Sequence, residues 1–356
     1  MPMSPCLEVP RQYGERAIFL IKQLGLFDPT LKINQENSSL RIPLLRELSA
    51  NECNTLQKAI FLAKFCVYDF SEKILPSRKT LVDILAEELP PHLIASLPHS
   101  ADFVGDIAVL EIAPELENYK QKIGEAVLKT DKRIHTVLAK ASAVEGIYRT
   151  RKLEVIAGEV KTATVHKEYG CIYHVDLSRA YFSPRLSSEH ARVAGLVKEG
   201  ETVIDMFAGV GPFAIQIARQ RKRVHVYAVD LNPYAIELLT NNVAANRVVA
   251  KVTPILGDVR TVVHERLTRV ADRVVMNLPE KAIEFVHTAC EAIKPTGGIM
   301  HYYEFTNAPN LLRTTEVRLI EAVERGNRGV DRILTSRIVR ATAPFTCQVV
   351  VDAEIA

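Results

Sequence analysis

The sequence predicts an α/β protein in which a doubly wound, mainly parallel sheet follows two small α+β domains. Two observations support this. From about residue 171 onward, short apolar runs typical of strands alternate with helical stretches, the pattern of a parallel sheet with helices on both faces. Before that point the patterns are mixed and rich in turns. We therefore expect three domains, at residues 1–72, 73–170 and 171–356.

The first domain is expected to combine a helix with short strands. Residues 11–25 carry an apolar stripe at helical spacing that stops at Gly25. Residues 26–45 alternate between turns and two short strands, and residues 51–75 suggest a linking helix and an extended segment ending at Pro76. These patterns predict a small α+β unit.

The middle domain shows helices and strands separated by clear breaks. Helices are predicted at 80–89, 92–98 and 117–129, and strands at 105–113, 134–142 and 153–159. Residues 162–177 read as a hairpin that turns at Tyr169-Gly170.

In the third domain the predicted strands are 203–207, 224–230, 252–256, 273–278 and 299–305. Two further strand-like runs, 334–341 and 345–353, are separated by a short turn at Ala343-Pro344. We expect them to form a hairpin that closes the sheet.

Composition narrows the functional classes. Hydrophobic residues make up 47% and charged residues 24% of the chain, and the net charge of +3 is too small by itself to indicate nucleic acid. There is no apolar run long enough to span a membrane and no apolar signal-peptide core, so we expect a cytoplasmic protein without a membrane partner. The six scattered cysteines lack CxxC or His/Cys spacing, so free thiols and no metal site are expected.

The strongest local motif is VIDMFAGVGPFAI, at residues 203–215, a strand followed by a glycine turn that opens a helix. Gly209 and Gly211 let the backbone turn tightly and approach a ligand next to a helix N-terminus. Asp230 ends the next strand, where a carboxylate can accept hydrogen bonds from both ribose hydroxyls of a nucleoside. These features alone fit NAD and S-adenosylmethionine almost equally, because they satisfy the dinucleotide fingerprint.

Three further positions favour S-adenosylmethionine. Asp205, at the end of the first strand, can meet the ammonium group of methionine but would repel a pyrophosphate. Asp258 follows the third strand, where it can accept from the adenine amino group, and Pro212 removes an N–H that a pyrophosphate would use. Asp205 and Asp258 could instead simply cap helices, and that alternative stays open.

The fourth strand ends in Met276-Asn277-Leu278-Pro279-Glu280. Methyltransferases acting on exocyclic amines commonly have Asn or Asp, two prolines and an aromatic residue here, but this chain has Glu280 in place of the aromatic. Asn277 can still bond a base edge. A ring nitrogen such as guanine N1 carries a proton, so its methylation needs a general base. Glu189 is the best candidate, although an acidic residue there could also just begin a helix.

At this point the residues become recognisable. The chain resembles the archaeal and eukaryotic tRNA (guanine-37-N1)-methyltransferases, which have the class I methyltransferase, Rossmann-like fold. The matching segments, in order, are residues 105–116, 146–159, 166–189, 205–213, 228–233 and 277–279, with a looser match at 14–28. Six matches in the right order are far more specific than one glycine loop.

The resemblance implies a tRNA partner and an expected site. The first domain would check the outer corner of the tRNA, the middle domain would help grip it, and the third would hold the cofactor and the target base. In the catalytic set, Glu189 would take the N1 proton, Arg149 (or Arg151) would bond O6, Asn277 would hold the base edge and Tyr181 would position the nucleotide. The expected cofactor contacts are His190, Asp205, Phe207, Gly209, Gly211, Asp230, Leu231, Asp258, Val259 and Asn277.

One departure stands out: the family usually has Arg after the catalytic Glu, and this chain has His190. A histidine can still contact the methionine carboxylate, but its charge depends on pH. We expect a monomer.

Three other functions compete with this interpretation. A sister group transfers the aminocarboxypropyl group of the same cofactor to a tricyclic wyosine precursor, and some archaeal relatives of the N1 enzymes also methylate that precursor at carbon. An NAD-dependent oxidoreductase would require Asp205 and Asp258 to be incidental. A catalytically inactive RNA-binding module would leave Asp230, Asp258 and Asn277 unexplained. Retention of both DMFAGVGPF and NLP favours the N1 methyltransferase.

Overall fold

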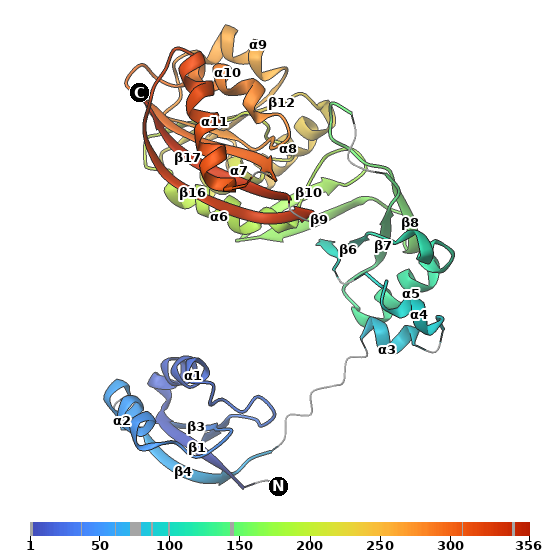
Figure 1. Ribbon diagram of the computed structural model, residues 1–356, viewed down its shortest axis with the longest axis vertical. Helices are drawn as coiled ribbons and strands as arrows, with labels where there is room; N and C mark the ends of the chain where they lie inside the picture. Colours follow the sequence, from blue (N-terminus) through green and yellow to red (C-terminus); the bar gives the residue numbers. More distant parts are fainter. Residues whose placement is uncertain are drawn as a thin grey trace. The chain divides into compact units, whose positions relative to one another are not determined.

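The computed structural model describes residues 3–36, 38–60, 62–71, 80–86, 88–98, 100–142, 146–307, 309–343 and 346–356 (Figure 1). It forms two compact units, Met1–Lys79 and Thr80–Ala356. The expected boundary after residue 72 and the stop at Pro76 lie outside the described residues. The division of the second unit into two domains stays a prediction.

The first unit is a four-stranded antiparallel sheet with two helices. Its elements are β1 (Met3–Pro10), α1 (Gly14–Gln23), β2 (Asn34–Glu36), β3 (Ser39–Pro43), α2 (Ala50–Ala59) and β4 (Lys64–Asp69), and the sheet order is β2-β3-β1-β4. Helix α1 buries Ala17 and Ile21 against the sheet, which confirms the helix expected at 11–25. Strand β1 was not expected, because Pro5 and Pro10 within it are unfavourable in strands.

A disulfide in the first unit corrects the prediction of free thiols. Cys6 of β1 lies opposite Cys66 of β4 in the antiparallel register, and the two sulfurs are bonded. The prediction was wrong for this pair because the two cysteines are 60 residues apart in sequence and only strand pairing brings them together. The remaining cysteines are free, namely Cys53, Cys171, Cys290 and Cys347.

The second unit begins with a small sheet of order β5-β6-β7-β8. Its elements are α3 (Leu81–Leu85), α4 (Pro91–Ile94), β5 (Asp102–Val104), β6 (Ile107–Leu110), α5 (Lys120–Thr130), β7 (Thr136–Lys140) and β8 (Leu153–Gly158). The strand expected at 105–113 is in fact the second arm of a tight hairpin, because Gly105 adopts φ +56° and turns the chain between β5 and β6. Helix α5 packs on this sheet through Ile123 and Val127.

A separate hairpin, β9 (Ala163–Glu168) and β10 (Cys171–Asp176), turns at Tyr169-Gly170 as predicted. Asn242 of helix α8 (Pro233–Ala245) and Asn246, the C-cap residue after it, hold the backbone of β10. Asn242 accepts from the amide of His174 (2.6 Å), and Asn246 accepts from that of Ile172 (2.9 Å). The hairpin is thereby fixed against the large sheet.

The large sheet has the order β13-β12-β11-β14-β15-β17-β16. Its strands are β11 (Thr202–Asp205), β12 (His225–Asp230), β13 (Val252–Leu256), β14 (Arg273–Met276), β15 (Gly298–Thr306), β16 (Val330–Ala343) and β17 (Thr346–Ile355). Strands β11 to β15 pair in parallel, and β17 lies antiparallel between β15 and β16. This confirms the doubly wound sheet and the closing hairpin, although Pro344 of the expected turn lies outside the described residues.

Helices cover both faces of the large sheet (Figure 1). Alternate residues of β11 divide between two cores: Val203 packs with α6 (Ser187–Leu196), α7 (Pro212–Gln220) and α8, while Ile204 packs with α9 (Val259–Val262), α10 (Val286–Ala292) and α11 (Leu311–Arg325). The strand order reverses at β11, between β12 and β14, so a crevice is expected at the carboxyl ends of these strands. None of the described helices is long and apolar enough to cross a membrane.

Candidate active site

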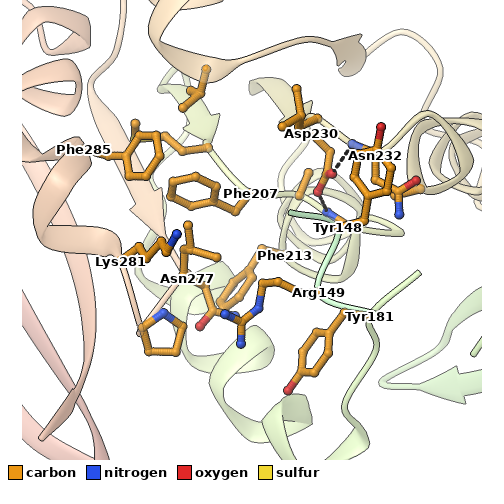
Figure 2. A pocket seen from close by; sticks show the side chains of 18 of the residues that line it. Tyr148, Arg149, Tyr181, Phe207, Phe213, Asp230, Asn232, Asn277, Lys281 and Phe285 are labelled. Carbon is orange, nitrogen blue, oxygen red and sulfur yellow. Dashed lines mark hydrogen bonds between the residues drawn. The ribbon is translucent and has the colours of Figure 1, made fainter. Parts of the chain in front are cut away.

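A cavity of about 280 Å³ lies in that crevice and is lined by the loops after β11, β12, β13 and β14 (Figure 2). It brings together most residues expected from the sequence: Arg149, Tyr181, His190, Phe207, Gly209, Asp230, Leu231, Asp258, Val259 and Asn277. Asp205, Gly211 and Glu189 do not line it. In the described part of the chain, no group of three or more His, Cys, Asp or Glu residues is arranged to bind a metal ion.

The glycine turn after β11 shapes one wall of the cavity. Gly211 adopts φ +92° as the N-cap of α7, and a Cβ there would approach Leu239 Cδ1 to 2.3 Å. Gly211 therefore serves the conformation of the loop and the packing of α8, not direct contact with a ligand. Gly209, at φ +54°, faces the cavity.

Asp230 ends β12 and is held by two backbone amides. The amide of Gly209 donates to Oδ2 (2.7 Å) and that of Asn232 donates to Oδ1 (2.8 Å), as the dashed lines in Figure 2 show. Burial nevertheless raises the pKa of this carboxyl. Each oxygen keeps a further lone pair, so the side chain is oriented and still able to accept from hydroxyl groups in the cavity.

Asp205 ends β11 and is fully buried, yet neither carboxylate oxygen has a hydrogen-bond partner among the described residues. The amides of Phe207 and Ala214 approach it without normal hydrogen-bond geometry. Burial, with a smaller contribution from the charge of Asp230, raises the pKa of Asp205 to about 7. An unpartnered buried carboxylate is costly, and this one is well placed to be satisfied by a cationic group.

The loops after β12 and β13 form an apolar slot. Leu231 and Val259 line it, and the rings of Phe207 and Phe285 meet edge to face with centroids 5.0 Å apart (Figure 2). Asp258 also lines the cavity, but it does cap α9, accepting from the Arg260 amide (2.9 Å), and it pairs with the Arg260 guanidinium (2.6 Å). The hydrogen bond from Arg260 lowers the pKa of Asp258.

His190, from α6, lines the cavity beside the glycine turn and is almost fully buried. Its Nδ1 lies 2.6 Å from Oε1 of Glu168 at the end of β9, and its ring packs edge to face on Phe213. Burial of Glu168 raises the pKa of its carboxyl, but the nearby His166 and the hydrogen-bonded His190 outweigh that effect and leave the pKa below its usual value. The Glu168 carboxylate thus fixes the orientation of the His190 ring.

Arg149, Tyr181 and Asn277 line another part of the cavity (Figure 2). The Arg149 guanidinium lies 5.7 Å from the centroid of the Tyr181 ring and forms two bonds to Glu280, at 2.6 and 3.1 Å. Arg149 has φ +55°, which is uncommon for a residue other than glycine. Its side chain reaches Glu280, which follows β14 of the large sheet. Arg151 lines only a neighbouring cavity.

Glu189 is placed differently from this set. Its side chain is 1% exposed, and Arg192 Nη2 (2.6 Å) and the hydroxyl of Tyr303 (2.7 Å) donate to Oε1. Oε2 accepts from Arg337 of β16. Both oxygens are therefore occupied by protein donors, and the carboxylate lies behind the cavity wall.

A second cavity adjoins the first and shares with it Arg149, Tyr181, Phe182, Ser183, Phe305 and Arg340. Its remaining lining includes the cations Lys140, Arg151 and Arg185 and the carboxylates Asp102 and Glu280, with Arg185 paired to Asp102. Arg340 of β16 and Gln348 of β17 also belong to the first cavity but were not expected from the sequence. No local signal marks them, because only the antiparallel return of β17 beside β15 brings them to the site.

Three family models match consecutive parts of the chain. They are the tRNA methyltransferase 5 N-terminal domain (residues 6–52), the TYW2 N-terminal domain (81–162) and the TRM5/TYW2 methyltransferase domain (164–331). Together they match parts of both compact units.

Curated relatives match over the whole chain or over part of it. The tRNA (guanine(37)-N(1))-methyltransferases Trm5b of Pyrococcus abyssi and Methanocaldococcus jannaschii are 36% and 33% identical, over 98% and 96% of this chain and the same shares of their own. An aminocarboxypropyltransferase acting on 4-demethylwyosine(37) in tRNA(Phe), also from M. jannaschii, is 32% identical over 70% of this chain and 96% of its own.

Solved structures also divide into those that match the whole chain and those that match part of it. The crystal structure of Trm5b from P. abyssi has a TM-score of 0.71 at 35% identity and covers 99% of this chain and 100% of its own. The complex of aTrm5 with tRNALeu has a TM-score of 0.69 at 32% identity, over 100% of both chains. The complex of M. jannaschii TYW2 with AdoMet has a TM-score of 0.57 at 28% identity and covers 72% of this chain and 99% of its own. The chain belongs to the TRM5/TYW2 family of methyltransferases, and within it to the tRNA (guanine(37)-N(1))-methyltransferases.

Proposed function

We propose that this protein transfers the methyl group of S-adenosylmethionine to N1 of the guanine at position 37 of tRNA, 3′ of the anticodon. The observation that carries the proposal is the similarity to Trm5b enzymes over 98% of both chains, first unit included. Relatives that act on the wyosine precursor match only about 70% of the chain. We also propose that the protein works as a monomer in the cytoplasm, with tRNA as its partner and no membrane.

The cavity has groups that fit each part of this cofactor. The lone pairs of Asp230 suit the ribose hydroxyls, and the slot between Leu231, Val259 and Phe207 suits an adenine ring. Asp205 is buried behind the cavity wall without a hydrogen-bond partner among the described residues, and its carboxylate would stabilise the ammonium group if that group reaches it. His190, held by Glu168, is placed to meet the methionine carboxylate. When bound, the cofactor supplies a methyl group on a positively charged sulfur as the electrophile.

The acceptor guanine is proposed to enter where the two cavities join. Tyr181 and Phe305 line both cavities and offer aromatic faces for a base taken out of the RNA stack. The cations around the second cavity suit the phosphates on either side of the nucleotide. A base held there points its Watson–Crick edge, with N1 and O6, toward Asn277 and the cofactor end.

Catalysis then requires one proton to leave N1. Glu189 would take this proton from N1, and Arg149 would donate to O6, where negative charge builds up. In the structure both side chains are held by other partners, Glu189 by Arg192 and Arg337, and Arg149 by Glu280. Catalytic hydrogen bonds often form only in the substrate complex, so these ion pairs must exchange when the RNA binds.

The decisive experiment identifies the modified nucleoside. An unmodified tRNA transcript with guanine at position 37 is incubated with the protein and S-adenosylmethionine, digested and analysed by mass spectrometry against authentic standards. We expect 1-methylguanosine, and none from a transcript with adenine at that position. The matched alternative is a tRNA carrying 4-demethylwyosine. If only that substrate gains a methyl or aminocarboxypropyl group, the protein is a wyosine-pathway transferase and the proposal is wrong.

A further inference from the structure

Arg340 stands at the junction of the two cavities without a carboxylate partner among the residues that the structure describes. Its Nε donates to Oε1 of Gln348 (2.9 Å), and its terminal nitrogens donate to Ser183 Oγ (3.2 Å) and to the hydroxyl of Tyr181 (3.5 Å). Gln348 in turn is fully buried and donates from Nε2 to Oδ1 of Asn277 (3.2 Å). The three side chains form a hydrogen-bonded row that ends at the acceptor site.

The donors of Arg340 fix the orientation of both side-chain amides in this row. A guanidinium has only donors, so the amide atom of Gln348 that faces Arg340 must be its oxygen. The amino group of Gln348 therefore faces Asn277, and the atom of Asn277 that receives it must be the carbonyl oxygen. The amino group of Asn277 is left to face the cavity.

We propose that Arg340 and Gln348 are positioning residues that present Asn277 to the cavity as a donor and so make it a reader of a carbonyl beside the reacting ring nitrogen. The inference rests on the proposed function and assigns its base selectivity. Guanine and hypoxanthine carry a carbonyl at C6, whereas adenine carries an amino group there, which the Asn277 amino group would repel. An enzyme that methylates an exocyclic amine needs the opposite orientation, with the carbonyl oxygen turned toward the base.

The test reverses the row with one isosteric change. In Gln348→Glu the carboxylate still accepts from Arg340 but has no donor for Asn277, so the Asn277 amide turns over and points its oxygen at the base. We expect the preference for guanine over adenine at position 37 to fall by roughly 10- to 100-fold, since a donor is replaced by a repelling acceptor. The preference for hypoxanthine over adenine at position 37 should fall by the same factor as the preference for guanine.

Two readouts are measured on transcripts that differ only at position 37. The first is the ratio of dissociation constants for guanine and adenine tRNA, with S-adenosylhomocysteine present, and the second is the ratio of kcat/KM. The binding ratio tests the row even if the protein does not make 1-methylguanosine, so failure of the proposed function and failure of this inference are separate results. Effects of the added charge on phosphate contacts apply to both transcripts and cancel in the ratio.

The matched control is Gln348→Leu, which removes the row without reversing it. Asn277 can then turn either way, so the guanine preference should fall by only a few-fold, less than in Gln348→Glu. A merely structural role for Gln348 predicts the opposite ranking, because Leu leaves Arg340 and Asn277 unsatisfied whereas Glu keeps the bond to Arg340. An unchanged preference in Gln348→Glu, or a larger loss in Gln348→Leu, overturns the inference.

Discussion

In the cofactor-binding part of the site Asp230 keeps lone pairs free, and the buried Asp205 has no hydrogen-bond partner among the described residues. Near the acceptor end, by contrast, Glu189 and Arg149 are both held in ion pairs. The two ends therefore differ in what must happen before a ligand is held. The cofactor end is arranged in advance by backbone amides and burial. The acceptor end must give up existing protein contacts, so RNA has to compete with Arg337 and Glu280 for the residues that it needs.

This difference indicates where selectivity for the RNA substrate can arise. A site arranged in advance binds whatever fits, but a site that must exchange ion pairs forms only when the incoming group replaces each lost contact. The correct base at the end of a correctly bound tRNA can supply those contacts. Four substitutions, at Glu189, Asp230, Asp205 and Glu280, test whether the two ends differ in this way.

The largest effect is expected for Glu189→Gln. Loss of the proton acceptor should lower kcat by roughly 10²- to 10⁴-fold, the contribution typical of a general base. Cofactor binding measured by calorimetry should stay near wild type, because Glu189 does not line the cavity. Single-turnover methylation at several pH values is the measurement.

Glu189 also neutralises two arginines, so this variant needs a structural control. Arg337→Met removes one of those partners, leaves the carboxylate in place and should retain most of the activity. Equal losses in both variants would mean that Glu189 supports the fold around β16 instead of taking a proton, and unchanged turnover in Glu189→Gln would rule out the base role.

The next effect is at the cofactor end. Asp230→Ala should weaken S-adenosylmethionine binding by roughly 10- to 100-fold, because charged hydrogen bonds to the ribose and the contact to the Gly209 amide are lost together. Asp258→Ala is the matched comparison and should cost only a few-fold, since that carboxylate is already satisfied by Arg260. Equal losses would show that the adenine contact matters as much as the ribose contact.

Asp205 should impose a pH dependence on the stability of the free protein. Its folded pKa of about 7 lies above the ordinary value of 3.8, so the folded state binds the proton more tightly. The stabilisation is complete below the ordinary pKa and is lost as pH rises through about 7. The Asp205→Asn variant should therefore have a higher Tm than wild type at about pH 8 and nearly the same Tm at about pH 4. Each kcal/mol of stability difference should shift Tm by a few °C.

Scanning calorimetry across that pH range measures the effect. A difference in Tm between wild type and Asp205→Asn that does not change with pH would show that Asp205 is not the titrating group. Added cofactor should narrow the difference at high pH, since its ammonium group would stabilise the carboxylate.

The smallest effect is expected for Glu280→Ala, which frees Arg149. The pair is partly exposed, with side-chain exposures of 19% and 49%, and such pairs contribute about 0–1 kcal/mol. KM for tRNA should therefore change by no more than about fivefold, downward if the ion pair competes with the RNA. Steady-state kinetics at two salt concentrations would decide, and a large rise in KM would mean that Glu280 itself contacts the substrate.

Sequence patterns predicted the large sheet well because its parallel strands are continuous apolar runs. Its glycine turn was also predictable, because it depends on two glycines in one short motif. Asp205, Asp230 and Asn277 were found in the same way, since the two aspartates end strands and Asn277 directly follows one. What could not be predicted depends on contacts between distant segments. The Cys6–Cys66 disulfide, the Arg337 contact to Glu189 and the row from Arg340 to Asn277 all arise from antiparallel pairing, whose register no short motif encodes.

Strand β17 carries one more consequence, for the synthesis of the protein. It lies between β15 and β16 in the sheet although it follows both in the chain. A ribosome that has delivered residues through Ala343 has made β16 but not the strand that separates it from β15, so the two must stay apart with open edges until β17 arrives. Because β17 also brings Gln348 to Asn277, the acceptor site is completed only by this last insertion, and a nascent chain halted earlier could hold cofactor contacts but no finished place for a base.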